Sequence, residues 1–252
     1  VPQISRSSGV SFTVDELKGK RYFGAKIIPG RGAWVEVESD PDGAIYVRID
    51  KKRKFPVSVL LRALGAKDND AILKVFAKDE DAKKAIETTL AKDPAKTQEE
   101  SFVEIHKKLR DGDLATPENA RSFVDSIFAK EKYDLSEVGR FKFNKRFGKS
   151  LDKAEIARRT INVEDVVAIV SNIVKLNANP HSLPDDIDHL GSRRIRSVGE
   201  MLQQKIRVGM TQMKRNIQDR MSTIDTDATM PVQFISPRPL QARLKEFFAT
   251  NQ

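Results

Sequence analysis

The sequence predicts an α+β fold, with antiparallel β hairpins near the N-terminus, a mainly helical segment in the middle and a long helix towards the C-terminus. Three patterns support this fold class. Between Trp34 and Glu38 apolar residues alternate with glutamates, which is typical of a half-buried strand. From Asp68 onward apolar residues recur at spacings of three and four, which is typical of amphipathic helices. After Ser197 such a spacing continues to Met221.

The β-rich part is expected between residues 10 and 50. Residues 21–28 have the composition of a strand, and residues 29–32 read Pro-Gly-Arg-Gly, a turn. Residues 40–43 read Asp-Pro-Asp-Gly, a second turn, and residues 44–50 complete a hairpin behind it. The chain opens without a methionine and with residues typical of a strand, so we expect a fragment of a longer protein.

Helices are expected through the middle of the chain. Pro56 begins a short one, which Gly65 ends. The longer ones are predicted over residues 68–77, 81–90, 97–109, 116–130 and 163–176. Residues 134–149, by contrast, are predicted to be a basic connector that carries three phenylalanines.

The longest helix is expected after Ser197. Its apolar stripe consists of Val198, Leu202, Ile206, Met210, Met213, Ile217 and Met221. Methionines at such spacing are typical of a packed core, so we expect the stripe to be buried. A final helix is expected over residues 238–248.

The bulk composition excludes several classes of protein. The chain has 252 residues, enough for one large domain or two small ones. There is no cysteine, so disulfides and thiolate metal sites are excluded. No apolar run approaches the length that spans a bilayer, and no signal peptide opens the chain. We therefore expect a cytoplasmic protein with no membrane partner.

The charge is strongly basic and unevenly distributed. The formal net charge is +9, and residues 193–220 contain eight basic residues against two acidic ones. A directed basic face of this kind favours a polyanionic partner, most often nucleic acid. Catalysis of the Ser-His or Cys-His kind has no support, because the sequence holds neither a Gly-x-Ser-x-Gly motif nor a phosphate-binding loop.

Within residues 185–200, three aspartates precede three arginines, with one glycine between the two groups. Asp185, Asp186 and Asp188 allow three interpretations: they hold a divalent cation for phosphoryl chemistry, as in a nuclease; they pair the adjacent arginines and satisfy loop amides; or one of them accepts hydrogen bonds from an unpaired base.

Arg193, Arg194 and Arg196 lie either on a solvated face or against phosphates. The basic run at residues 51–54 is a weaker signal of the same kind. Trp34, the single tryptophan, follows a glycine-rich turn; it is either a core residue or a platform on which an unpaired base stacks. From the residues alone, the chain is a basic nucleic-acid-binding module.

Several segments, in order along the chain, resemble the β subunit of bacterial DNA-directed RNA polymerase. The longest is DDIDHLGSRRIRSVGE at residues 185–200. The others are residues 6–10, 25–34, 47–54, 133–140 and 245–248, whereas residues 68–113 match poorly. The resemblance implies the lobe domain at residues 11–188, and a partial protrusion segment at residues 1–10 and 189–252 that leads toward the fork region.

The same resemblance implies a role within a nucleotidyltransferase. Mg²⁺ is then held by another subunit, so this chain is expected to contain no catalytic residue and no cofactor. The implied partners are DNA, the polymerase β′, α and σ subunits, and transcription regulators on the lobe. The rival interpretation is a stand-alone DNA-binding module with no enzymatic role.

The resemblance also implies a pocket for an unpaired guanine of the non-template strand. Its residues match Arg6, Ile187, Asp188 and Arg193, whereas Trp34 and Asp50 match lobe positions that face the downstream edge of the melted DNA. The family usually has proline where Ser8 stands, so we expect a looser turn behind Arg6.

Overall fold

The computed structural model describes residues 2–17, 19–110, 115–223 and 230–249. Contacts divide the chain into two compact units. One comprises residues 6–192, and the other combines residues 1–5 with residues 193–252. These divisions fall a few residues from the boundaries expected for lobe and protrusion, and the assignment of the units to those domains stays a prediction.

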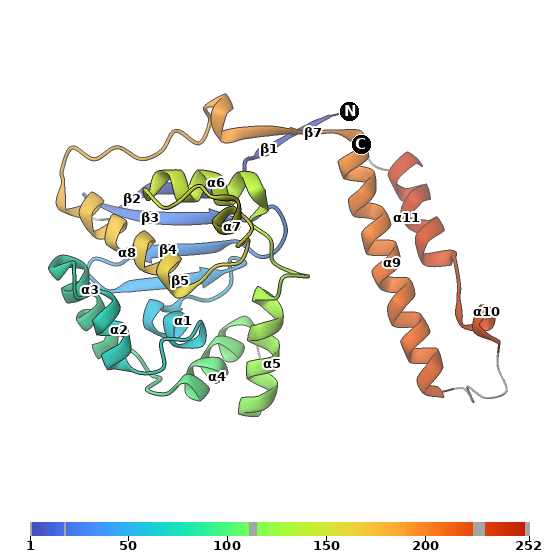
Figure 1. Ribbon diagram of the computed structural model, residues 1–252, viewed down its shortest axis with the longest axis horizontal. Helices are drawn as coiled ribbons and strands as arrows, with labels where there is room; N and C mark the ends of the chain where they lie inside the picture. Colours follow the sequence, from blue (N-terminus) through green and yellow to red (C-terminus); the bar gives the residue numbers. More distant parts are fainter. Residues whose placement is uncertain (1, 18, 111–114, 224–229, 250–252) are drawn as a thin grey trace. The chain divides into compact units, whose positions relative to one another are not determined.

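The larger unit contains a five-stranded antiparallel sheet in the order β2-β3-β4-β5-β6 (Figure 1). Its strands are β2 (Gly9–Leu17), β3 (Lys20–Ile28), β4 (Val35–Ser39), β5 (Ile45–Ile49) and β6 (Phe55–Pro56). The register aligns Phe12 with Ala25, Ala25 with Val37, and Val37 with Val47. All four side chains are buried. The β hairpins predicted near the N-terminus are confirmed.

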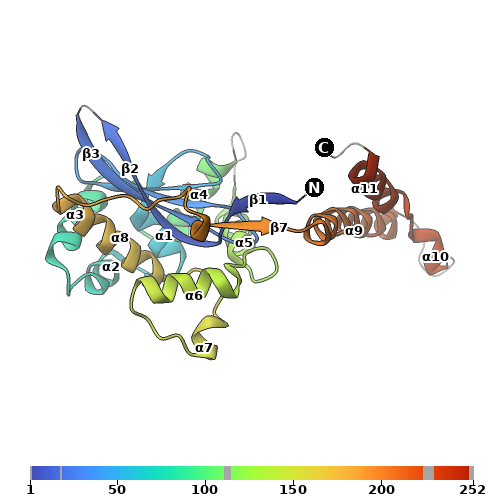
Figure 2. The same ribbon diagram turned by 90° about the horizontal axis from the view of Figure 1, so that it is seen from above.

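Two helices cover the apolar face of this sheet. α6 (Ser136–Arg146) packs on β2, and α8 (Val163–Ala178) packs on β3 and β4 (Figures 1 and 2). The opposite face carries cross-strand ion pairs. Lys26 Nζ lies 3.9 Å from Glu36 Oε1, and Arg48 Nη2 lies 3.3 Å from Glu38 Oε2. Alternation along each strand therefore sorts apolar residues to one side and charged residues to the other.

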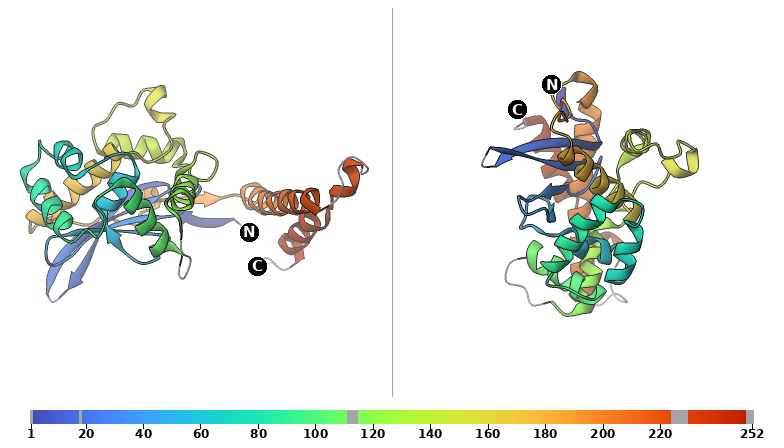
Figure 3. Two further views of the ribbon diagram at one scale, coloured as in Figure 1. Left: turned by 90° about the horizontal axis from the view of Figure 1, so that it is seen from below. Right: turned by 90° about the vertical axis from the view of Figure 1, so that its left-hand side faces the viewer.

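The helical middle gathers at the β5–β6 edge of the sheet (Figures 1 and 3). It consists of α1 (Val57–Ala63), α2 (Asn69–Val75), α3 (Glu80–Ala91), α4 (Gln98–Leu109) and α5 (Pro117–Phe128). The N-caps Asp68, Asp79, Thr97 and Thr116 each accept a hydrogen bond from the first helical turn. These caps explain where the helices begin, and the helices predicted here are confirmed.

An ion pair that the sequence analysis did not single out lies inside this helical part. The Arg62 side chain on α1 is fully buried, and its Nη1 lies 2.8 Å from Asp93 Oδ2. Its Nη2 donates to Asn69 Oδ1 at 2.8 Å, and Nη1 also donates to Ser101 Oγ at 3.3 Å. One guanidinium thus links α1 to α2, to α4 and to the turn before α4.

The prediction of a connector at residues 134–149 is wrong, because most of that segment forms α6. The buried side of α6 includes Arg140 and Asn144, whereas Val138 and Phe141 are exposed. Apolar residues therefore do not follow one helical face, and periodicity could not reveal the helix. Arg140 is buried because its Nη1 pairs with Asp165 Oδ2 on α8 at 2.8 Å. A short α7 (Lys153–Ile156) follows.

Among its described residues, the smaller unit contains a two-stranded sheet and three helices. β1 (Gln3–Arg6) pairs with β7 (Arg193–Arg196), and α9 (Val198–Thr223) packs along α11 (Arg238–Ala249). α10 (Pro231–Phe234) is a single turn. The long helix and the final helix are confirmed.

The three arginines lie in strand β7, which pairs with β1 and directly precedes α9. One expectation about the smaller unit is wrong. The apolar stripe of α9 was expected to be buried, but two of its residues, Met210 and Met221, are 47% and 53% exposed. Met201, which lies beside the stripe, is buried. Among the residues that the structure describes, no helix has both the length and the apolar character needed to cross a bilayer.

Candidate nucleic-acid interface

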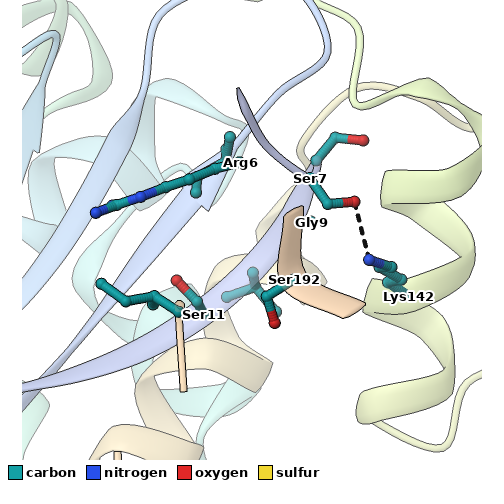
Figure 4. Close-up of a pocket in the computed structure, with 10 residues that line it drawn as sticks. Arg6, Ser7, Gly9, Ser11, Lys142 and Ser192 are labelled. Atoms are coloured by element: carbon teal, nitrogen blue, oxygen red, sulfur yellow. Dashed lines mark hydrogen bonds between the residues drawn. The ribbon is translucent and has the colours of Figure 1, made fainter. Parts of the chain in front are cut away.

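The larger unit holds a small pocket at the start of β2 (Figure 4). Its volume is about 70 Å³, well below the ~300–1,000 Å³ of typical small-molecule sites. It is lined by Arg6, Ser7, Ser8, Gly9, Val10, Ser11, Ile28, Lys142, Ile187 and Ser192. A depression of this size accepts part of one group and does not enclose a whole ligand.

Three segments that are far apart in the sequence meet at this pocket. The Ser7 backbone N–H donates to the Ser192 carbonyl at 2.9 Å. From α6, Lys142 Nζ donates to Ser7 Oγ at 2.8 Å and to the Gly191 carbonyl at 3.0 Å. Figure 4 shows the first of these lysine bonds, with the Arg6 side chain extending away from it. Residues 6–11, α6 and residues 187–192 therefore form one bonded site.

Ser8 is anchored in the turn behind Arg6, and the looseness expected of this turn relative to one with proline stays a prediction. Its side chain is buried, and its Oγ lies 2.7 Å from Ser136 Oγ at the start of α6. Gly139 permits this approach, because a Cβ built there would lie 3.0 Å from Ser8 Cβ and Oγ. A serine hydrogen bond thus holds the turn at the position where proline was expected.

Arg6 and Trp34 contact each other, although the sequence analysis gave them separate roles. The Arg6 Cζ atom lies 5.8 Å from the centroid of the half-buried Trp34 ring, within the range of cation–π attraction. The Trp34 carbonyl accepts a hydrogen bond from the Asp50 N–H at 2.9 Å. Asp50 and Lys51 both have positive φ, at 50° and 57°. They are the central residues of a tight turn, which presents the exposed Asp50 beside Trp34.

Two of the three aspartates have structural roles. Asp185 accepts from Arg146 Nη1 and Nη2 at 2.6 and 2.8 Å, and from the Phe12 N–H at 2.7 Å. The cationic partner of Asp185 is therefore Arg146 on α6. For Asp185, the interpretation that the aspartates pair the adjacent arginines is wrong. Asp186 Oδ1 accepts from the backbone of Asp188 at 2.9 Å and of His189 at 3.1 Å. Within the described ranges, no group of three His, Asp or Glu side chains could hold a metal ion.

The remaining aspartate is presented at the surface. Asp188 is exposed, and its backbone is held by Asp186. Its neighbour Ile187 is half-buried and lines the pocket. The structure therefore brings Arg6 and Ile187 into one pocket and places Asp188 next to it in the chain.

The predicted arginines of β7 belong to the smaller unit. Arg194 Nη1 donates to Glu200 Oε2 at 2.7 Å, and Arg196 Nε lies 3.6 Å from Glu200 Oε1. The hydrogen bond from Arg194 lowers the pKa of Glu200, and Glu200 in turn raises the pKa of Arg194. Arg193 is exposed. For all three, contact with phosphates stays a prediction.

The comparisons with known proteins point to one family. The family described as RNA polymerase Rpb2, domain 2, matches residues 6–196. The chain belongs to this family. It is also 41% identical, over its whole length, to the DNA-directed RNA polymerase subunit beta of Syntrophomonas wolfei and to that of Synechocystis sp.. It spans 22% of the length of each of these relatives.

Within this Rpb2 domain 2 chain, sequence reasoning missed the contribution of α6. Lys142 and Arg146 bind the segments that carry Arg6 and Asp188, but both lie where a connector was expected. The resemblance at residues 133–140 stopped just before them. The sequence signal for this contribution was the helical spacing of three basic residues, Lys142, Lys145 and Arg146. Many solvated helix faces carry basic residues at the same spacing, so the signal is weak.

Proposed function

We propose that this chain is part of DNA-directed RNA polymerase, a nucleotidyltransferase, and that it forms a wall of the DNA channel that contacts the non-template strand and downstream DNA. Membership of the family and the 41% identity to β subunits support the assignment to polymerase. The observation that carries the DNA-contacting role is the pocket that joins Arg6 to Ile187, with Asp188 following at the surface.

The chemistry of these groups suits an unpaired guanine. Guanine carries a ring N–H and an amino N–H side by side, and a carboxylate with two acceptor oxygens can take both bonds. In this proposal Asp188 accepts these two bonds, and the apolar Ile187 side chain packs on the base. Arg6 then holds the backbone phosphate, since phosphate contacts fix position and base contacts supply specificity.

Trp34 and Asp50 are proposed to meet the strand at the downstream edge of the melted region. The Trp34 face is half-buried and already stacked against one cation, and an aromatic ring in such a setting can stack an unpaired base. Arg193, Arg194 and Arg196 are proposed to hold further phosphates from the smaller unit.

In the same proposal, nucleotide addition and its Mg²⁺ belong to another subunit, and this chain supplies no catalytic residue. Its partners are then DNA, the β′, α and σ subunits, and regulators on the lobe, in the cytoplasm. Association with these subunits distinguishes the proposal from a stand-alone DNA-binding module, which would bind DNA without them.

The test is the substitution Asp188→Ala in the assembled polymerase. Lifetimes of promoter complexes are measured on four templates that differ only in one unpaired non-template base. Loss of a bidentate base contact worth about 1–3 kcal/mol should reduce the preference for guanine by about 5- to 150-fold. Asp15→Ala, at an exposed aspartate of β2, serves as the control. Equal shortening on all four templates would count against base recognition by Asp188.

A further inference from the structure

Lys142 joins the two segments that carry the proposed guanine pocket. Its Nζ donates to Ser7 Oγ at 2.8 Å and to the Gly191 carbonyl at 3.0 Å. Ser7 directly follows Arg6, and Gly191 lies three residues after Asp188 in the chain. The lysine is therefore bonded close in the chain to two of the groups that contact the DNA in the proposed function, Arg6 and Asp188.

We propose that Lys142 is a positioning residue of the guanine pocket, which sets the distance between the segment of Arg6 and the segment of Asp188. The proposal rests on the proposed function and adds a third element, α6, to the site. An ammonium group has three donors in a tetrahedral arrangement, so two bonds to different segments constrain the angle between them as well as their separation.

The helix that carries Lys142 is itself firmly held. Ser136 Oγ contacts Ser8 Oγ at 2.7 Å, and Gly139 lies against the same serine. On its other side, Arg140 pairs with Asp165 of α8 at 2.8 Å, with both side chains buried. Lys142 thus extends from a rigid base toward the pocket, as a positioning group requires.

Removal of this ammonium leaves a connection between the two segments. The Ser7 N–H still donates to the Ser192 carbonyl at 2.9 Å, and the Asp185 N–H still donates to the Phe12 carbonyl at 2.9 Å, so the segments stay joined, but the angle between Ser7 and Gly191 is no longer fixed by the ammonium. The half-buried Lys142 stem can be retained by methionine, which has a similar apolar length. The pocket should therefore lose its geometry without loss of the fold.

The experiment uses the assembled polymerase with Lys142→Met and the four templates that differ in one unpaired non-template base. The ratio of complex lifetimes, guanine over the other bases, should fall by about tenfold or more, because small misplacements of binding groups are costly. Lifetimes on the three other bases should stay within about twofold of wild type. Ser7→Ala, which removes one of the two lysine bonds, should give a smaller loss of the same ratio.

Lys145→Met is the matched control, because Lys145 is an exposed lysine on the same helix. An unchanged guanine ratio in Lys142→Met would overturn the positioning role. So would an equal loss on all four templates, which would indicate a general phosphate contact or a folding defect. If the wild-type enzyme itself shows no guanine preference, the proposed function fails first, and that outcome is separate from failure of the lysine.

Discussion

The buried ion pair between Arg62 and Asp93 yields a sharp prediction about stability. The two side chains are 0% and 1% exposed, and their atoms are 2.8 Å apart. Asp93 also accepts from Ser58 Oγ, and its Oδ1 accepts from the Ala95 N–H at 2.8 Å. The substitution Asp93→Ala removes all three interactions and leaves the guanidinium buried with neutral partners only.

The expected cost is about 3–5 kcal/mol, because loss of one partner leaves an uncompensated buried charge. For a unit of this size that corresponds to a fall in Tm of about 6–20 °C, at roughly 2–4 °C per kcal/mol. The control is Asp40→Ala. Asp40 Oδ2 pairs with Lys54 Nζ at the same 2.8 Å, but these side chains are 24% and 41% exposed. Exposed pairs contribute only about 0–1 kcal/mol.

Denaturant unfolding followed by tryptophan fluorescence is a suitable assay, since Trp34 is the single tryptophan and lies in the same unit as Arg62. The double substitution Arg62→Met with Asp93→Leu should recover most of the stability, because an apolar pair of similar volume removes the unpaired charge. If Asp93→Ala destabilises the unit no more than Asp40→Ala, burial does not govern this pair and the reasoning is refuted.

Two further predictions concern Glu200 and Gly139. Because Arg194 lowers the pKa of Glu200, the pair should stabilise the fold fully above the usual glutamate pKa of about 4.3, and this stabilisation should be lost as the pH falls through the lower folded value. The difference in unfolding midpoint between wild type and Glu200→Gln, measured by circular dichroism, should thus be present at about pH 7 and should shrink as the pH falls below about 4.3. A difference that is constant with pH would contradict the prediction. Gly139→Ala should destabilise the larger unit by about 1–3 kcal/mol through overpacking against Ser8. The control is Gly199→Ala, which should be neutral or stabilising because its new Cβ would lie 4.0 Å from its nearest neighbour. Equal effects of the two substitutions in thermal melts would argue against the close contact at Gly139.

The sequence by itself determined the local elements. The alternation around Val35 and Val37 was sufficient to predict β4, because the period of two is set by the backbone of a single strand. Helix starts at Thr97 and Thr116 could be predicted because an N-cap bonds its own first turn. The short motifs that resemble polymerase β subunits are local in the same sense, and they pointed to the family that residues 6–196 match.

The tertiary structure alone decided how these elements meet. α6 is helical although its buried side contains Arg140, since the partner that neutralises this cation, Asp165, lies 25 residues away. The bonds of Lys142 to Ser7 and Gly191 span 135 and 49 residues. Side chains at such separations come together only when the sheet, α6 and residues 185–192 pack against one another, and no periodicity along the chain records that packing.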